Sequence, residues 1–428
     1  MKRLRIACGL WLGLLAAPGS ADTYIHAGRV IDGKSDLARG ESTIVVRDGQ
    51  IVRILPGFVE PGKDDDRIDL SKHTLLPGLM DMHTHLVADG RSALTDGFEL
   101  GPADLVLKAE KNALATLMAG FTLVRDLGDS YNVTVALRKA IDHGDVVGPH
   151  IFAATSALSS TGGHGDPTNG LAPALRHLPT TEEGVIDSPD EARKAVRQRY
   201  KDGADVIKVM ATGGVMSLER DGQGPQLSQA EMDAIVATAR DYGMTVAAHA
   251  HGAEGLARAI RAGVATIEHG TYLNDDLIRM MKERGTFLVP TLMAGEWISQ
   301  KAAIDGYLPP AVRPKAAAIG PLMAATFTRA RQAGVRILFG TDSGVSAHGE
   351  NAHEFVLMTA AGMPAMDAIR SATSIPAAFL GIADRYGTVE AGKVADLIAV
   401  PGDPVTDIAM LGKVDFVMLA GRIVKAPR

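Results

Sequence analysis

Cysteine is almost absent from this sequence: of its 428 residues one is a cysteine, Cys8, near the amino terminus. A fold held together by disulfide bonds is therefore excluded, and a chain of this length can bury enough apolar surface to need none. Long hydrophobic runs are also missing, because no stretch reaches the roughly 18 apolar residues that indicate a transmembrane helix. Glycine and proline together make up about 16% of the chain, below the level that indicates low complexity.

The sequence also lacks an excess of basic over acidic residues. The sequence has 44 Lys and Arg against 50 Asp and Glu, which gives a formal net charge of −6. The two signs are well mixed and form no basic stripe that could neutralise phosphates, so we expect no nucleic-acid partner. The hydrophobic fraction of 46% and the charged fraction of 22% are typical of a folded globular protein.

The first 21 residues are typical of a secretory signal peptide. Lys2, Arg3 and Arg5 form a basic start, Ile6–Ala17 is apolar, and small residues lead up to Ala21. The apolar run is shorter than the ~20 residues that span a bilayer. We therefore predict cleavage after Ala21 and a secreted or periplasmic protein without a membrane attachment. An uncleaved anchor or a buried amino-terminal helix is the alternative.

The middle of the chain, residues 76–383, reads as repeated strand–helix units. Between its β-rich runs lie helical patterns at Asp104–Ala119, Ser188–Asp202 and Ser228–Tyr242, the last two with helix-start signals. Alternation of this kind predicts a parallel sheet, and eight units predict an α/β fold of the closed (β/α)₈ TIM-barrel type. The eight β-rich runs are Thr74–His85, Phe121–Gly128, His150–Ser159, Asp205–Gly213, Thr245–Gly252, Ala265–Gly270, Thr286–Leu292 and Arg336–Asp342.

Both ends of the chain have a different pattern. Residues 22–75 and 384–428 contain short alternating runs interrupted by Gly and Asp. We expect the two ends to form one small β-sandwich domain beside the barrel. Three segments after predicted strands, residues 161–188, 216–225 and 293–320, are expected to be long loops around the barrel mouth.

Ligand-type side chains end several of the predicted strands. The active site of a (β/α)₈ barrel lies at the carboxyl ends of its strands. Histidines at i and i+2 point to the same face of a strand, and imidazole and carboxylate are common ligands of Zn²⁺. The sequence therefore predicts a metal site at this end of the barrel. The residues concerned are His83 and His85 on the first run, His249 and His251 on the fifth, His269 on the sixth and Asp342 on the eighth.

Lys208 lies inside the fourth β-rich run, where a side chain is expected to be buried. An unpaired ammonium group in such a place costs several kcal/mol. One solution is a salt bridge to a buried carboxylate. The other is reaction of the amine with CO₂ to give an anionic carbamate that can bridge two cations.

The order of these residues resembles that of the amidohydrolase superfamily. The segments 76–83 (LPGLMDMH) and 391–397 (AGKVADL) are typical of it. Segments 124–128 (VRDLG), 161–165 (TGGHG) and 208–214 (KVMATGG) resemble the imidazolonepropionase-related group, which includes Xaa-Pro dipeptidases and ochratoxin-hydrolysing amidases. Imidazolonepropionases themselves lack the lysine of the fourth strand, so Lys208 argues against that activity.

The resemblance implies a centre with two divalent metal ions, most plausibly Zn²⁺. His83, His85 and Asp342 would bind one ion, and His249 and His269 the other. Carboxylated Lys208 would bridge them. We expect His251 to contact the substrate or to support the metal ligands. The alternative is that His251 binds the metal in place of His249.

The catalytic roles that follow belong to Asp342 and His164. Two cations would make hydroxide available at neutral pH for attack on an amide carbonyl. Asp342 would take the proton and pass it to the leaving nitrogen, and His164 would donate a hydrogen bond to the developing oxyanion. Arg220, Arg125 and Tyr272 are candidates for binding the substrate carboxylate.

We therefore predict a metal-dependent hydrolase of C–N bonds with a small-molecule substrate: a dipeptide, an N-acyl amino acid or an amide like ochratoxin A. Hydrolysis of a cyclic amide or a lactone is the alternative activity. An inactive barrel used as a scaffold would have lost ligands, and all six are present. The family resemblance further implies a homo-oligomer.

Overall fold

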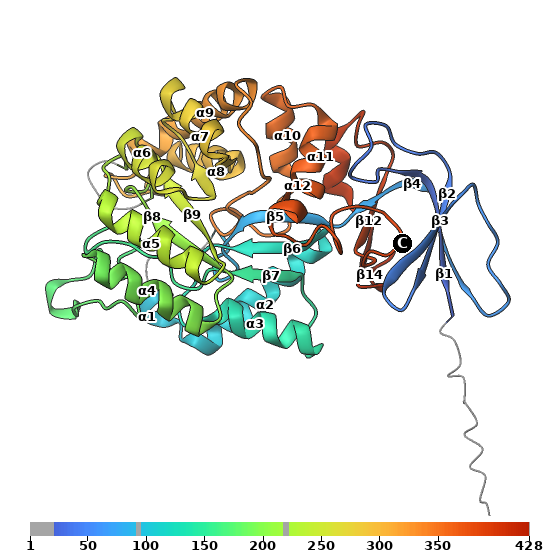
Figure 1. The fold of residues 1–428 in the computed structure, drawn as a ribbon, viewed down its shortest axis with the longest axis horizontal. Helices are drawn as coiled ribbons and strands as arrows, with labels where there is room; N and C mark the ends of the chain where they lie inside the picture. The colour runs from blue at the N-terminus through green and yellow to red at the C-terminus, as the bar shows by residue number, and fades with distance from the viewer. Residues whose placement is uncertain (1–20, 91–95, 217–221, 428) are drawn as a thin grey trace, which may run out of the picture.

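The computed structural model describes residues 21–90, 96–216 and 222–427 (Figure 1). The predicted signal peptide, apart from Ala21, and the candidate Arg220 lie outside these residues. The chain forms a mixed α/β structure of the TIM-barrel type, with a separate sheet at one side. Within the described residues, no helix is both long and apolar enough to cross a bilayer.

Both ends of the described chain meet in one seven-stranded sheet, in the order β14-β13-β12-β4-β1-β2-β3. Figure 1 shows the blue amino-terminal strands and the red carboxyl-terminal strands together at the right. The long central strand of this sheet, β4, pairs in parallel with β1 and antiparallel with β12. The strands are β1 (Thr23–Val30), β2 (Ser42–Arg47), β3 (Gln50–Pro56), β4 (Asp66–Pro77), β12 (Leu397–Pro401), β13 (Phe416–Leu419) and β14 (Arg422–Lys425).

This sheet has an apolar core of its own, to which both ends contribute. Ile25, Ile44 and Leu75 from the amino-terminal strands pack in one cluster with Leu397 and Phe416. The union of the two ends is thus as expected from their alternating patterns. The strand order describes one sheet, so the second layer of a sandwich stays a prediction.

Seven of the predicted strand–helix runs contain parallel strands. They form two sheets, β5-β6-β7 and β11-β10-β9-β8. Each strand lies within its predicted run and is shorter than it. The first run differs most from its prediction, because its residues Thr74–Pro77 belong to β4. The strands are β5 (Leu79–Thr84), β6 (Phe121–Asp126), β7 (His150–Ala153), β8 (Val206–Met210), β9 (Thr245–Ala250), β10 (Thr266–His269) and β11 (Phe287–Val289).

The eighth predicted run, Arg336–Asp342, does not form a regular strand, and this expectation is corrected. It nevertheless lies between β11 and β5: Leu338 N donates to Leu288 O at 3.0 Å, and Met82 N donates to Phe339 O at 2.9 Å. Glycines and residues with positive φ at its end, Asp342 among them, break the regular ladder. On the other side, Leu158 bridges to Val209 and connects the β7 loop with β8.

Helices follow most of the barrel strands. The predicted starts are confirmed at two of them: Ser188 Oγ accepts from Glu191 N at 3.2 Å, and Ser228 forms a capping box with Glu231. The helices are α1 (Asp96–Glu99), α2 (Pro102–Met118), α3 (Val133–His143), α4 (Pro189–Asp202), α5 (Gln229–Asp241), α6 (Ala253–Ala262), α7 (Asp275–Arg284), α8 (Leu292–Ala302), α9 (Arg313–Gln332), α10 (His353–Ala360), α11 (Ala365–Ser371) and α12 (Ser374–Phe379), with short 3₁₀ turns at Pro173–Leu175 and Ile408–Lys413.

The segment 293–320, expected to be a long loop, is mainly helical. It contains most of α8 and the start of α9. Gly295 and Gly320 let the two helices pack closely, because a Cβ on Gly320 would lie 3.0 Å from Gly295 O. The glycines and Pro321 inside α9 obscure the helical pattern in the sequence.

Candidate metal centre and active site

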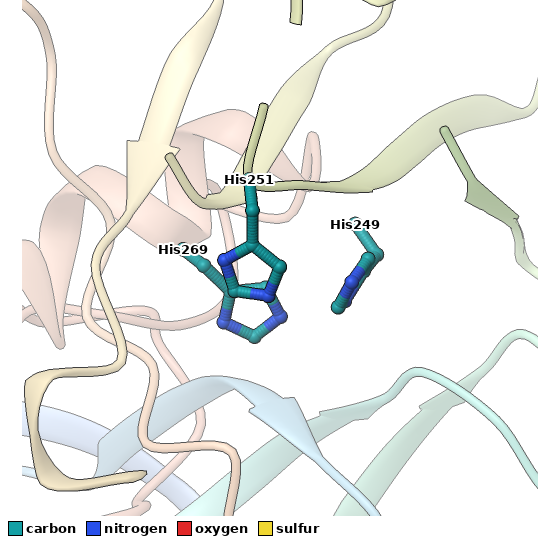
Figure 2. A group of neighbouring side chains, drawn as sticks. All are labelled: His249, His251 and His269. Carbon is teal, nitrogen blue, oxygen red and sulfur yellow. The ribbon is translucent and has the colours of Figure 1, made fainter. Parts of the chain in front are cut away.

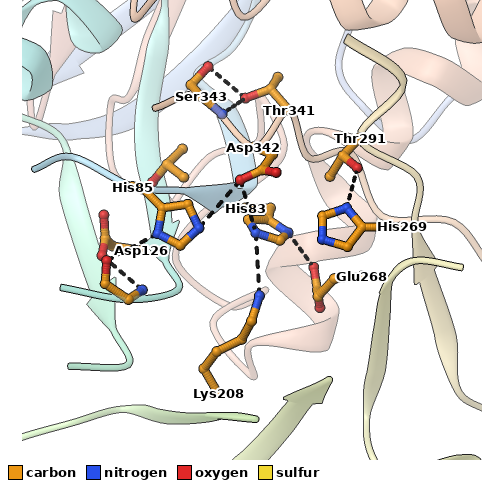
Figure 3. A network of polar contacts seen from close by, with 12 residues as sticks. His83, His85, Asp126, Lys208, Glu268, His269, Thr291, Thr341, Asp342 and Ser343 are labelled. Atoms are coloured by element: carbon orange, nitrogen blue, oxygen red, sulfur yellow. Dashed lines mark hydrogen bonds and ion pairs between the residues drawn. The ribbon is translucent and has the colours of Figure 1, made fainter. Parts of the chain in front are cut away.

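His83, His85 and Asp342 meet where β5 ends beside the 336–343 segment (Figure 3). Asp342 Oδ1 lies 3.4 Å from His83 Nε2 and 3.3 Å from His85 Nε2. His269 joins from β10, and the ligand atoms of His83, His269 and Asp342 all lie within 4.8 Å of one another. Residues 259 positions apart in the sequence thus face the same point, as the strand-end pattern predicts.

A second group consists of His249, His251 and His269 (Figure 2), whose ligand atoms also lie within 4.8 Å of one another. The rings of His249 and His251 have centroids 4.6 Å apart, and His249 and His269 4.7 Å apart. His269 therefore belongs to both groups and links them. The structure brings His249 and His251 equally into the site, so geometry does not favour one as the ligand.

Lys208 points from β8 into the same centre, as Figure 3 shows. Its Nζ lies 3.4 Å from His83 Nε2, and its side chain is almost fully buried. Burial lowers the pKa of this ammonium to about 8, although Glu268 and Asp342 act in the opposite direction. The ammonium form still predominates at neutral pH, but the neutral amine is more readily available than in an exposed lysine.

The donor set fits divalent metal ions. Burial holds the pKa of His83 at about 4 and those of His249 and His269 well below their usual value, so these imidazoles stay neutral with a lone pair to donate. For Asp342, burial alone would raise the pKa, but the surrounding imidazoles hold it far below its usual range, so it is an anion. Neutral imidazoles around a carboxylate are the ligand chemistry of Zn²⁺ and similar ions.

Glu268 supports the metal-ligand candidates and was not predicted from the sequence. Its Oε2 lies 2.8 Å from His83 Nδ1, and its Oε1 accepts from Arg125 Nη2 at 3.0 Å. An acceptor at Nδ1 fixes the imidazole so that Nε2 faces the centre. Burial opposes the charge, yet Arg125 and His83 hold the pKa of Glu268 at about 2. The Arg125 guanidinium is thus hydrogen-bonded to Glu268 and to the carbonyl of Met82. The expectation that it binds the substrate carboxylate is therefore corrected.

A second buried carboxylate, Asp81, ties β5 to the segment that carries Asp342. It accepts from His83 N at 3.1 Å, from Thr341 Oγ1 at 2.6 Å and from Asn351 Nδ2 at 2.8 Å. Burial raises its pKa to about 6 despite these donors. Like Glu268, Asp81 lies inside an apolar run, and an acidic residue at such a position in the sequence indicates a buried carboxylate.

His269 and Asp342 both have backbone conformations that L-residues rarely adopt, with φ of 70° and 59°. Such strain persists where the surroundings hold it, and it is concentrated at functional sites. At His269 the support includes Thr291, whose Oγ1 lies 2.7 Å from Nδ1. The strained backbone turns each side chain out of the regular strand alternation.

His164 lies beside the second group, with its ring centroid 4.5 Å from that of His249. Its backbone N donates to Gln226 Oε1 at 2.8 Å, and its ring packs on Gly214, where a Cβ would lie 2.5 Å from Nδ1. Burial lowers its pKa to about 4, and within the described residues its buried Nδ1 has no hydrogen-bond partner. A neutral imidazole with an unused ring nitrogen is suited to contact a substrate.

The predicted substrate residues have different outcomes. His251 lines the cavity, with its Nδ1 2.7 Å from Thr271 Oγ1. Tyr272 follows β10 and its N donates to His251 O, but it is not among the residues that line the cavity around the histidines. Arg220 lies outside the described residues.

One cavity is lined by the metal-ligand candidates and His164, and it has two chemically different parts. Its polar part holds His83, His85, His164, Lys208, His249, His251, His269 and Asp342. Its apolar part holds Met210, Val215, Met216, Ala294, Gly295, Ile298, Ile319, Met323 and Val345. Helices α8 and α9 supply much of the apolar part, so the segment expected to be a loop forms a wall of the site.

Comparison with known proteins gives consistent findings. A sequence model of the amidohydrolase family matches residues 74–424. An ochratoxinase from Aspergillus niger is 31% identical over 95% of this chain and 87% of its own length. The crystal structure of an Xaa-Pro dipeptidase with bound methionine in the active site is 48% identical, with a TM-score of 0.91 over 95% of this chain and 100% of that one. A prolidase complexed with N-methylphosphonate-L-proline is 30% identical, with a TM-score of 0.85 over 95% and 100% of the chains.

Proposed function

This chain belongs to the amidohydrolase family, and from that membership we propose that it hydrolyses an amide bond next to a free carboxylate group. The predicted resemblance is thereby confirmed, and so is the class of reaction, hydrolysis of a C–N bond. The observation that carries the proposal is the convergence of His83, His269 and Asp342 with buried Lys208 in one cavity.

We assign two divalent metal ions to the site, Zn²⁺ being the best match to its imidazoles and carboxylate. His83, His85 and Asp342 would hold one ion and His249 and His269 the other, with His251 close enough to take the place of His249. Bound ions supply Lewis acidity, which lowers the pKa of water and polarises a carbonyl oxygen.

Lys208 would contribute as a carbamate. Its neutral amine adds to the carbon of CO₂, one N–H proton leaves to solvent, and the product is an anion on the former ammonium side chain. Burial favours this step because the depressed pKa, about 8, provides neutral amine. The anion also replaces a buried positive charge beside His83 by a negative one that attracts cations.

Asp342 and His164 would act on the substrate. As the water oxygen bonds to the amide carbon, Asp342 takes the proton and then delivers it to the nitrogen. The C–N bond breaks, and a carboxylate and an amine result. His164, neutral and lying against His249, donates a hydrogen bond to the carbonyl oxygen as negative charge develops on it.

Substrates of this class are suggested by the relatives. The names of an Xaa-Pro dipeptidase and an ochratoxinase state their substrates, and a prolidase was crystallised with N-methylphosphonate-L-proline. The methionine in the active site of the dipeptidase is a small amino acid with a free carboxylate and an apolar side chain. Dipeptides and N-acyl amino acids with apolar side chains are therefore the first compounds to test.

The test is hydrolysis by the purified protein after its metal content has been measured. We expect about two ions per chain and release of amino acids from dipeptides, N-acyl amino acids or ochratoxin A. Cleavage of lactones or cyclic amides in place of linear amides would replace the proposal by the alternative activity. Inactivity toward all of these compounds, with the metals bound, would support an inactive scaffold.

We also propose a closed eight-position barrel over residues 76–383, a small β-sandwich domain from 22–75 and 384–428, and a homo-oligomer. The hydrogen bonds of the 336–343 segment to β5 and β11 support closure. Light scattering coupled to size-exclusion chromatography tests the oligomer. A mass equal to one chain of 44.9 kDa or slightly less would refute it.

Export and cleavage after Ala21 remain our proposal for the amino terminus. Asp22 N lies 2.9 Å from Asp65 Oδ1, so a new terminal ammonium at Asp22 would face a carboxylate. Amino-terminal sequencing of protein expressed with its full leader should give Asp22 first. A mature chain that starts at Met1 would refute the proposal.

A further inference from the structure

One face of α9 borders the cavity at two positions. Ile319 and Met323, four residues apart, both line it together with the histidines. Lys315 lies four residues before Ile319 in the first turn of the same helix. Residues spaced by four lie on one face of a helix, so Lys315 continues the cavity-lining face toward the end of the helix.

A hydrogen bond fixes where the Lys315 ammonium lies. Its Nζ donates to Gly214 O at 3.3 Å. Gly214 is the residue on which the His164 ring packs, and it directly precedes Val215 of the cavity wall. Lys315 is not itself among the cavity-lining residues, but this bond holds its ammonium group against the backbone that leads to Val215, on the side of His164.

The electrostatic environment agrees with this position. Burial is the main cause of the lowered pKa of His164 and His251, and the charge of Lys315 adds to the effect at both. A cation in the first turn of a helix also adds to the positive end of the helix dipole. Both contributions have the sign that attracts an anionic group to the side of the cavity where His164 lies.

The apolar side of the cavity lies one and two turns further along α9. Ile319 and Met323 line this part of the site together with Ile298 and Gly295 of α8. A Cβ on Gly295 would lie 2.7 Å from Met323 Sδ, so the glycine leaves the thioether its place in the wall. This part offers dispersion contacts and no charge to a substrate side chain.

We propose that this face of α9 determines substrate specificity: Ile319 and Met323 receive an apolar side chain, and Lys315 binds the free carboxylate. The inference rests on the proposed amide hydrolysis and names the residues that select its substrate. It gives Lys315 the role of carboxylate partner, which Arg125 cannot fill because its guanidinium is bonded to Glu268 and to the carbonyl of Met82. In this arrangement one helix contacts both the apolar side chain and the carboxylate of a small substrate whose amide lies at the metal ligands.

The first test separates the carboxylate from the rest of the substrate. Lys315→Met keeps most of the side-chain length and removes the charge. We expect kcat/KM for methionyl-methionine to fall roughly 10- to 100-fold, as for loss of a charged hydrogen bond. For methionyl-methionine amide, which lacks the carboxylate, the wild type and the variant should agree within about twofold.

Lys301→Met is the matched control, because the Lys301 ammonium lies over the rings of Trp297 and Tyr307, whereas that of Lys315 is bonded to Gly214 beside His164. It should leave both substrates unaffected. Equal loss for acid and amide in Lys315→Met, or no loss for either, overturns the role of Lys315 while the hydrolase function stands. A wild-type protein that cleaves neither compound overturns the proposed function itself.

The second test addresses the apolar part. Met323→Gln keeps the side-chain length and places an amide in the wall. We expect the preference for methionyl-methionine over glutaminyl-glutamine, as a ratio of kcat/KM values, to fall roughly tenfold. An unchanged ratio, with an unchanged melting temperature, overturns the assignment of Met323.

Discussion

Asp342 combines three properties that a proton carrier needs: it is anionic, it touches two imidazoles, and its strained backbone holds it in place. Its Oδ1 lies within 3.4 Å of both His83 Nε2 and His85 Nε2. The φ of 59° is maintained by Thr341 and the Asp81 network behind it. The Asp342 side chain therefore already points into the site and needs no rearrangement to reach it.

Replacing Asp342 by Asn should lower kcat by at least about 100-fold, because the amide cannot take the proton from water. The side chain keeps its shape and an oxygen donor, so metal content measured by mass spectrometry should stay near that of the wild type. Asp384→Asn, at an exposed position, is the control. Near-normal kcat in Asp342→Asn would remove the residue from the mechanism.

Lys208 gives a second prediction at this scale. Protein prepared in ¹³C-bicarbonate should show a carbamate carbon signal, and Lys208→Met should lose both the signal and bound metal. The physical reason is that the variant has no amine to react with CO₂. A wild-type protein with two metals and no carbamate signal would show that Lys208 acts as an ordinary cation.

The sequence predicted the ligand candidates better than their supports. His83, His85, His249, His269 and Asp342 were identifiable because the ends of barrel strands converge, whatever lies between them. Glu268 was not, since its partner Arg125 is 143 positions away and nothing local indicates the pair. Tyr272 bonds to the backbone of His251 but does not line the cavity, so its role in substrate binding stays a prediction.

At the scale of elements, α8 depends on a residue of another helix. Its N-cap residue Thr291 makes no capping hydrogen bond with its side chain. Glu354 of α10 accepts instead, from Leu292 N at 2.9 Å and Met293 N at 2.7 Å. These are N–H groups of the first turn that have no partner within the helix. The apolar wall of the cavity is thus anchored by a buried carboxyl group.

Glu354→Gln should destabilise the protein by about 1–3 kcal/mol, because an amide N–H₂ replaces one acceptor. Burial raises the pKa of Glu354 from 4.5 to about 8. Between these values the folded state binds more protons than the unfolded state, so this group makes the wild type less stable as pH rises.

The stability advantage of the wild type over Glu354→Gln should therefore shrink between pH 5 and pH 8, as measured by denaturant unfolding. Exposed Glu350→Gln should show no such trend. An advantage that grows with pH would mean that Glu354 is ionised in the folded protein.

Elements with clear start signals were predictable, and those defined by tertiary packing were not. α4 and α5 begin at the serines that the sequence indicates. α8 and α9 were missed because glycines at their contact and Pro321 look like loop residues in the sequence. The eighth run has the composition of a strand, but the geometry of Asp342 takes precedence over regular pairing.

At the scale of the whole molecule, the two ends of the chain depend on each other. β4 has β12 as its neighbour on one side, and residues of both ends form one apolar cluster. The sequence predicted this union from similar alternating patterns, but it could not give the strand order, which depends on long-range pairing.

Deleting residues 397–428 should therefore prevent folding, since it removes β12 to β14 and with them Leu397, Ala399, Phe416 and Met418 from the core. We expect insoluble protein, or soluble protein without a cooperative thermal transition in circular dichroism. Deletion of 426–428 alone should have no effect. A truncated protein that melts at the wild-type temperature would show that the barrel folds without the sheet.

The shared sheet also determines when, during synthesis of the chain, its strands can pair. Thr74 Oγ1 donates to the carbonyl of Gly402, 328 positions later. At roughly 5–20 residues per second, the ribosome needs about 15–65 s to travel between them. During translation β4 therefore lacks its neighbour β12, and this sheet can be completed only after the last strands have been synthesised.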